Sequence, residues 1–144
     1  MKRILAVDYG RRRIGLAVSD PLGITAQGLE TVAGGSLKRA AVAVAQVAEA
    51  QEAGEIVVGL PLNMDGSAGE MAAEAGAFAA EVERRTGLPV RRWDERLTSV
   101  AAHRAMREMG VRTKGRKGDV DRMSAVLILQ GYLDSKKGGP GAGG

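Results

Sequence analysis

The order of apolar runs and helical segments constrains the fold of this chain more than any other feature. Three apolar runs come first, over residues 3–7, 14–19 and 24–32, and only short turns separate them. Connections this short join antiparallel strands. Two further runs, over residues 55–61 and 90–93, lie on either side of a helical segment, which is typical of parallel strands joined by a crossover helix. The sequence therefore predicts an α/β domain with a mixed five-stranded sheet.

Four helices are expected to flank this sheet. Helical periodicity, capping residues and glycine stops place them over residues 36–53, 69–85 and 98–109, with a last helix that starts near residues 119–121. Apolar residues of the last helix recur on one face at Ala125, Ile128, Leu129 and Tyr132. The predicted order of elements is therefore βββαβαβαα.

The length of the chain limits it to one domain. A chain of 144 residues has room for a single sizeable core but not for two. We expect residues 1–135 to form this domain and the Gly-rich residues 136–144 to form a disordered tail. No basic leader precedes an apolar segment, and no run approaches the roughly 20 apolar residues that span a bilayer. We therefore expect a cytoplasmic protein.

Charge and cysteine content narrow the chemistry. The formal net charge is +4, which favours anionic partners such as nucleic acid. The chain has no cysteine and a single histidine, His103, which we expect on a helix surface rather than in a catalytic role. Disulfides and thiolate metal sites are excluded. Any bound metal is then expected to be a hard cation with carboxylate ligands.

Three carboxylates occupy positions that could bring them together. Asp8 ends the first apolar run, Glu95 follows the fifth, and Asp121 opens the last helix. Ligands gather beyond the carboxyl ends of parallel strands, so these acids meet if the first and fifth strands lie near each other. Carboxylates at such close range need a divalent cation such as Mg²⁺ or Mn²⁺ to offset their repulsion. Such a cation would activate water against a phosphodiester.

A structural reading of the acids stays open. Taken singly, an aspartate at a helix start is more often a cap than a ligand. Asp20, Asp94 and Asp119 are weaker candidates for a fourth acid, and Asp20 before Pro21 is typical of a turn. Trp93 could stack a base, although a lone tryptophan on a strand usually packs in the core.

Basic residues lie next to these acids in the sequence. One group comprises Arg11, Arg12 and Arg13, in the turn after Asp8, and another comprises Lys114, Arg116 and Lys117, in a Gly-rich loop before Asp121. Both groups could bind the phosphates of a nucleic-acid backbone. The alternative is solubilising charge on exposed turns. A third loop, over residues 59–67, could offer backbone N–H groups to phosphate near a helix start.

Four motifs in this order resemble the RuvX family, which is also called YqgF. They are VDYGRRRIGLAVSD (7–20), VVGLPLNMDGSAGEMA (57–72), DERLTS (94–99) and KGDVDRMSAVLILQGYL (117–133). Members of that family are described as Holliday junction resolvases or pre-16S ribosomal RNA nucleases, with an RNase H-like fold. The resemblance implies that Asp8, Glu95 and Asp121 are the catalytic, metal-binding acids. It also implies a substrate role for Arg96.

These observations predict a metal-dependent nuclease that acts on structured nucleic acid, foremost at the 5′ end of pre-16S rRNA. A Holliday junction resolvase is the first alternative, and it would require a homodimer, whereas RNA trimming can be done by a monomer. A non-catalytic nucleic-acid-binding protein is the second. A sugar-kinase- or actin-like ATPase shares the strand–DxG–hairpin of residues 8–10, but it needs two such domains. Endonucleolytic or exonucleolytic cleavage, and one or two metal ions, stay open.

Overall fold

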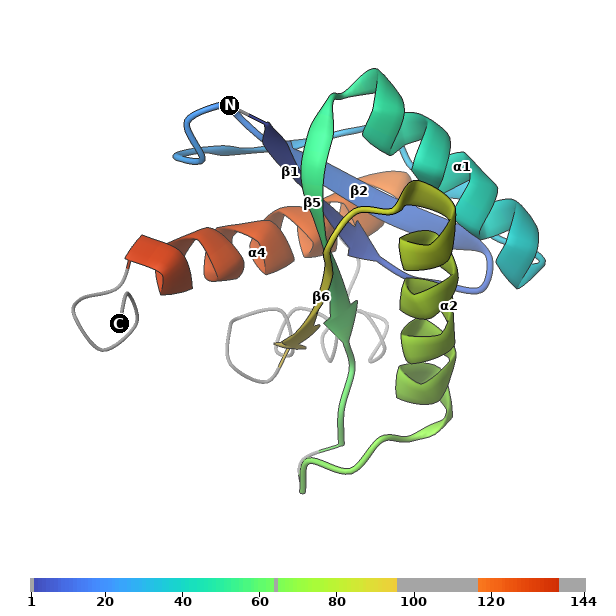
Figure 1. The fold of residues 1–144 in the computed structure, drawn as a ribbon. Helices are drawn as coiled ribbons and strands as arrows, with labels where there is room; N and C mark the ends of the chain where they lie inside the picture. Colours follow the sequence, from blue (N-terminus) through green and yellow to red (C-terminus); the bar gives the residue numbers. More distant parts are fainter. Residues whose placement is uncertain (1, 64, 96–116, 138–144) are drawn as a thin grey trace.

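The computed structural model describes residues 2–63, 65–95 and 117–137 (Figure 1). Its elements are β1 (Arg3–Asp8), β2 (Arg13–Ser19), β3 (Ala26–Gly28), β4 (Val32–Ala33), α1 (Leu37–Ala50), β5 (Ala53–Leu60), α2 (Glu70–Thr86), β6 (Val90–Asp94) and α4 (Lys117–Lys137). The helix expected over residues 98–109 lies outside the described residues, as do His103, Arg96, Lys114 and Arg116.

The sheet is mixed, as predicted. Its strand order is β3-β2-β1-β5-β6, and β4 also pairs with β2. Strand β1 pairs with β2 in antiparallel and with β5 in parallel orientation, and β5 pairs with β6 in parallel. The carboxyl ends of β1, β5 and β6 therefore meet at one edge of the sheet, which is where the sequence placed the candidate site.

The predicted third strand is wrong in one respect, because it is split into β3 and β4 and the sheet has six strands rather than five. Ala17 pairs with Gly28 and Ile14 pairs with Val32, so three residues of the third run lie opposite two residues of β2. One extra residue on one strand interrupts a ladder in the manner of a bulge. Residue types do not reveal such a register mismatch.

Helices cover both faces of the sheet. Figure 1 shows α1 and α2 on one side and α4 crossing the other side. Alternate residues of β1 supply the two cores: Leu5 and Val7 pack with α1 and α2, whereas Ala6 packs with Ile128 and Leu129 of α4. No helix of the described part of the chain has the length and apolar character to cross a membrane.

The helix ends agree with the capping residues, with small shifts. The Oγ atom of Ser36 accepts a hydrogen bond from the N–H of Arg39 at 3.1 Å, which is the predicted N-cap of α1. Helix α1 ends at Ala50, earlier than expected, because Glu52 takes a positive φ of 55° and starts the turn into β5. Gly87, at φ 69°, ends α2 in the left-handed conformation.

Helix α4 is longer than the sequence indicated. It begins at Lys117, ahead of residues 119–121, and it continues to Lys137, past the expected boundary at residue 135. Its predicted apolar face is confirmed, since Ala125, Ile128, Leu129 and Tyr132 are buried against the sheet.

Candidate active site at the carboxyl ends of the parallel strands

Asp8 lies at the carboxyl end of β1 and is almost fully buried, at 4 % exposed. The alternation of β1 places it on the same face as Ala6, the face that α4 covers. Val7 pairs with Val58 in the parallel register, so the next residues along, Asp8 and Gly59, are neighbours at the strand ends. The first predicted acid is thus held on a rigid strand at the expected edge.

Glu95 lies at the same edge of the sheet as Asp8, on the other side of β5. It directly follows β6, it is 1 % exposed, and Trp93 two residues earlier pairs with Gly59. A Cβ atom built on Gly59 would lie 2.9 Å from the Oε2 atom of Glu95. The carboxylate of Glu95 therefore lies over the backbone of Gly59, and Asp8 and Glu95 flank this glycine on the α4 face.

Gly59 makes this arrangement possible. A side chain at this position would also meet the Cδ1 atom of Ile128 at 2.5 Å, so no residue other than glycine fits without movement. The structure confirms that Gly59 lies within the strand expected over residues 55–61, rather than in the substrate-facing loop that was its alternative. A glycine within an apolar strand marks a close approach of other atoms to the backbone. That signal was present in the sequence and was missed.

Asp121 lies near the start of α4, one to two turns before the residues that pack against the sheet. Residue 121 precedes the buried Ser124 and Ala125 by one turn and Ile128 by two turns. Ile128 is the residue that approaches Gly59. The side chain of Asp121 lies outside the described part of the chain. Among the described side chains, no three acidic or histidine residues converge on one point.

The chemistry of the described pair fits a hard divalent cation. Two buried carboxylates on one face of adjacent strand ends are costly unless positive charge compensates them. Asp8 and Glu95 offer oxygen ligands only, as Mg²⁺ and Mn²⁺ prefer. The absence of a side chain at Gly59 lets the Glu95 carboxylate lie directly against the backbone of β5 on the α4 face. The donor set therefore suits the cation that the sequence implied.

The three arginines of the turn after Asp8 have different surroundings. The Nε atom of Arg11 lies 3.1 and 3.0 Å from the two carboxylate oxygens of Glu74, and its guanidinium also reaches Glu70 at 3.4 Å. The hydrogen bond from Arg11 lowers the pKa of Glu74. Arg11 thus fastens the turn to α2. Arg12 is exposed, and Arg13 opens β2.

The weaker acid candidates lie elsewhere. Asp20 follows the end of β2, at the opposite edge of the sheet, because β2 runs antiparallel to β1. Its carboxylate accepts hydrogen bonds from the backbone N–H groups of Thr25 and Ile24, both at 2.7 Å, and the bond from Thr25 lowers its pKa. Asp20 is the predicted turn former. Asp94 is the last residue of β6 and directly precedes Glu95. Asp119, Asp121 and Lys117 belong to α4, and their side chains are not described.

A second charged cluster, missed by sequence reasoning, lies on the same face near the start of β5. Glu55 accepts hydrogen bonds from the hydroxyl of Tyr132, from Arg91 at 3.2 Å and from Lys136 at 3.2 Å. Burial and the bond to Glu55 raise the pKa of Tyr132 to about 12. Trp93 packs edge-on against Tyr132, with ring centroids 5.9 Å apart, which confirms its packing role. We call Glu55, Arg91, Tyr132 and Lys136 the Glu55 cluster.

Comparison with known proteins gives a consistent set of relatives. The model of the RuvX family, described as Holliday junction resolvase, matches residues 2–135. A protein of Lachnospira eligens is 47% identical, covering 94% of this chain and 99% of its own length. One of Koribacter versatilis is 52% identical, covering 93% and 88%. Both are named "Putative pre-16S rRNA nuclease".

Solved structures show the same fold. The Thermus thermophilus RuvC protein in complex with a Holliday junction substrate has a TM-score of 0.57 and 17% identity, with 96% of this chain and 97% of that chain covered. The fowlpox virus Holliday junction resolvase has a TM-score of 0.53 and 12% identity, with 92% and 99% covered. The expected RNase H-like architecture is confirmed by these neighbours.

Proposed function

The chain belongs to the RuvX family, and from this premise we propose that it is a divalent-metal-dependent nuclease that hydrolyses phosphodiester bonds in structured nucleic acid. One observation carries the proposal. Asp8 and Glu95, both buried, lie at the carboxyl ends of β1 and β6 and flank Gly59 of the intervening β5, where an oxygen-only donor set suits Mg²⁺ or Mn²⁺. Asp121, at the start of α4, is the third acid of the proposed set.

The residues of the chain have distinct tasks in this proposal. Asp8 and Glu95 hold the cation from rigid strand ends, and Gly59 keeps the space above β5 open for them. When bound, the cation would supply Lewis-acid stabilisation and lower the pKa of an attacking water. In the hydrolysis, the oxygen of water would bond to phosphorus as the bond from phosphorus to the leaving oxygen breaks, while the water loses a proton and the leaving oxygen gains one. Arg12, exposed in the turn after Asp8, is placed to contact a neighbouring phosphate.

Pre-16S rRNA is the substrate that we favour. The relatives at 47% and 52% identity are named for it, and both alignments cover more than nine-tenths of this chain. The net charge of +4 agrees with a nucleic-acid substrate. The proposed role is processing of the 5′ end of the precursor in the cytoplasm.

Resolution of Holliday junctions is the second candidate. The family model is described by this activity, and the fold matches RuvC solved with a junction substrate. Symmetric cutting of a four-way junction requires two active sites related by a dyad, so this candidate requires a homodimer.

A cleavage assay tests the proposal. Wild-type protein, Asp8→Asn and Asp134→Asn are incubated with Mn²⁺ and pre-16S rRNA, single-stranded RNA or a four-way DNA junction. Asp134 is an exposed acid of α4 and serves as the matched control. We expect Asp8→Asn to lower the cleavage rate by more than the roughly 100-fold that follows loss of an outer-shell metal partner, while Asp134→Asn cleaves normally.

The same assay separates the outcomes. Cleavage by Asp8→Asn at the wild-type rate, or wild-type cleavage in excess chelator, would contradict a metal site at Asp8. Cuts confined to the RNA precursor support the first candidate, and paired symmetric cuts in the junction support the second.

A further inference from the structure

A basic groove lies between α1 and α2, on the face of the sheet opposite to α4. Its volume is about 370 Å³, and it is lined by Lys38, Arg39, Val42, Ala43, Gln46 and Arg85. Three of these six residues are cations, and among the described residues that line it none is acidic. We call this the α1–α2 groove. Neither the fold nor the proposed chemistry at Asp8 and Glu95 accounts for it.

Two of its cations have no described task within the protein. Lys38 and Arg39 are exposed on the first turn of α1, and no described acidic side chain pairs with either of them. Positive charge at a helix start opposes the helix dipole, so the pair is not there to stabilise α1. Adjacent exposed cations at an unfavourable position indicate a function in binding anions.

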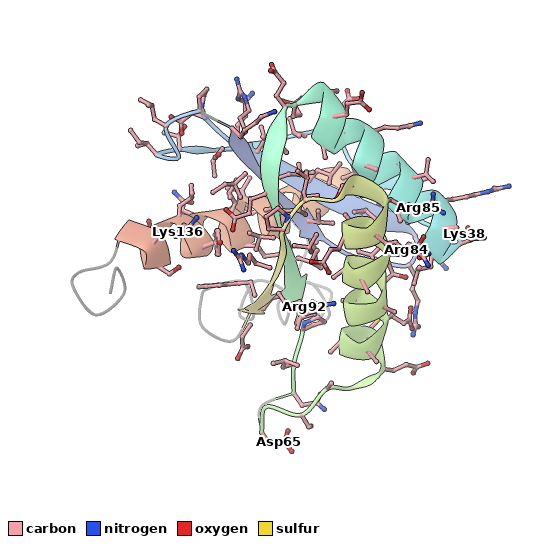
Figure 2. All side chains as sticks on the ribbon, viewed as in Figure 1. Lys38, Asp65, Arg84, Arg85, Arg92 and Lys136 are labelled. Carbon is pink, nitrogen blue, oxygen red and sulfur yellow. The ribbon has the colours of Figure 1, made fainter. Side chains whose placement is uncertain are left out.

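Arg85 enters the groove from the end of α2. The buried Glu81 accepts a hydrogen bond from its Nε atom at 2.7 Å and also pairs with Arg84. Glu81 compensates the charge of only one of these two arginines. Its hydrogen bond with Arg85 holds the guanidinium of Arg85 at the groove. Figure 2 shows Lys38, Arg84 and Arg85 together on one side of the molecule, whereas Lys136 lies on the far side.

Backbone hydrogen bonds join the arginine turn after Asp8 to the segment that leads into α1. The backbone N–H of Gly34 bonds to the carbonyl of Arg12 at 2.8 Å, and that of Gly35 bonds to the carbonyl of Arg11 at 3.0 Å. Gly35 directly precedes the Ser36 cap of α1. Exposed cations therefore follow one another from Arg12 to Lys38 and Arg39, and then to Arg85. This series starts in the turn that follows Asp8 and leads to the face of the sheet opposite to α4.

We propose that the α1–α2 groove binds the phosphate backbone of the nucleic-acid substrate outside the catalytic centre. The inference rests on the proposed function for the identity of its ligand. Exposed cations in series bind such a backbone through release of counterions, without reading its sequence. The exposed Val42 supplies an apolar contact for sugars between the cations.

The dimensions fit a substrate that extends well past the cleavage point. Arg11 joins the turn to Glu74 of α2, and Arg85 lies near the other end of that helix, which corresponds to about 16 Å along its axis. A nucleic-acid strand places roughly five phosphates over this length. Short oligonucleotides cannot fill both regions at once, so the groove favours long, structured substrates.

Binding measurements with a double variant test the proposal. Affinities of wild-type protein and of Lys38→Ala/Arg39→Ala are measured against a 20-base-pair RNA duplex, a four-way DNA junction and a four-nucleotide RNA, in excess chelator over a series of salt concentrations. We expect the variant to bind the duplex about tenfold more weakly and to show a log–log salt slope smaller by about 2. We expect the loss of affinity to be smaller for the four-nucleotide RNA. Whichever of the RNA duplex and the DNA junction loses more affinity in the variant has the preferred backbone.

Lys136→Gln is the matched control, because it also removes an exposed cation but lies on α4, away from the groove. Thermal unfolding verifies that the double variant is folded. Equal duplex affinity and salt slope in wild type and double variant would overturn the proposal, and so would an equal loss in Lys136→Gln. Binding is measured without metal, so a protein that binds the duplex through the groove but cleaves nothing would contradict only the proposed nuclease function.

Discussion

The face covered by α4 holds two groups of carboxylates, at opposite ends of β5, and they are built differently. Glu55, near the start of β5, receives hydrogen bonds from three donors of the protein itself. Asp8 and Glu95, at the far end, are more deeply buried and flank a glycine whose missing side chain lets Glu95 and Ile128 lie against the strand. The comparison teaches that one sheet face carries a carboxylate bonded into the protein structure and, at its other end, the buried pair that we propose binds a cation.

Gly59→Ala is the variant expected to separate the two ends most strongly. The new methyl group would lie 2.5 Å from Ile128 Cδ1 and 2.9 Å from Glu95 Oε2, so both must shift. Overpacking of this kind costs about 1–3 kcal/mol, and displacement of a catalytic group lowers activity by roughly 100-fold. Urea unfolding and the cleavage assay measure these effects.

Gly76→Ala is the control for that variant. Gly76 lies within α2, and a Cβ atom there would meet nothing within 4 Å. We expect it to stabilise the protein by up to about 1 kcal/mol and to cleave normally. Wild-type activity in Gly59→Ala would show that the position of the Glu95 carboxylate is not critical.

Glu55→Gln is expected to change stability rather than catalysis. The variant weakens the bonds to Tyr132 and Lys136, which hold the last turns of α4 to the sheet, and the bond to Arg91, which joins β5 to β6. Because both cations are at least half exposed, the expected loss is only about 1 kcal/mol in the free energy of unfolding. Glu83→Gln, at an exposed position of α2, is the matched control. A loss of cleavage in Glu55→Gln, with the fold intact, would assign this cluster to the active site.

The pH dependence of stability gives the smallest expected effect. Burial raises the pKa of Glu55, but the hydrogen bonds from Tyr132, Lys136 and Arg91 outweigh it, so its pKa lies below the ordinary value of 4.5. The stabilisation is therefore present above that value and is lost as the pH falls through the lower pKa of the folded state. Urea unfolding from about pH 6 to about pH 3 should show a shallower decline for Glu55→Gln than for wild type. Parallel declines would mean that Glu55 is not held in its charged form.

The sequence predicted the placement of Asp8 and Glu95 better than the Glu55 cluster for a physical reason. Strand ends follow from local patterns, and parallel pairing brings Asp8 and Glu95 to a common edge whatever the detailed packing. Glu55 and Lys136 are 81 positions apart, and their pairing depends on where α4 docks. Sequence reasoning therefore assigned Lys136 to a disordered tail, although it belongs to a helix that binds the sheet.

The different surroundings of the three arginines after Asp8 also depend on how a distant element docks, so the sequence did not distinguish them. Arg11, Arg12 and Arg13 are equivalent by composition, and all three were predicted to bind phosphate. Only the docking of α2 shows that Arg11 pairs with Glu74, 63 positions away, whereas Arg12 is exposed. Gly59 was different, since a glycine in an apolar strand was a local signal that could have been read.

Binding of Mn²⁺, followed by electron paramagnetic resonance, tests the central claim most directly. Wild-type protein, Asp8→Asn and Glu55→Gln are titrated in parallel without nucleic acid. If Asp8 and Glu95 hold the cation, wild type and Glu55→Gln bind Mn²⁺ with equal affinity, and Asp8→Asn binds it more weakly by more than the roughly 10- to 100-fold loss of an outer-shell partner. Equal binding by Asp8→Asn and wild type, or weakened binding by Glu55→Gln alone, would contradict the division of this face into a structural end and a catalytic end.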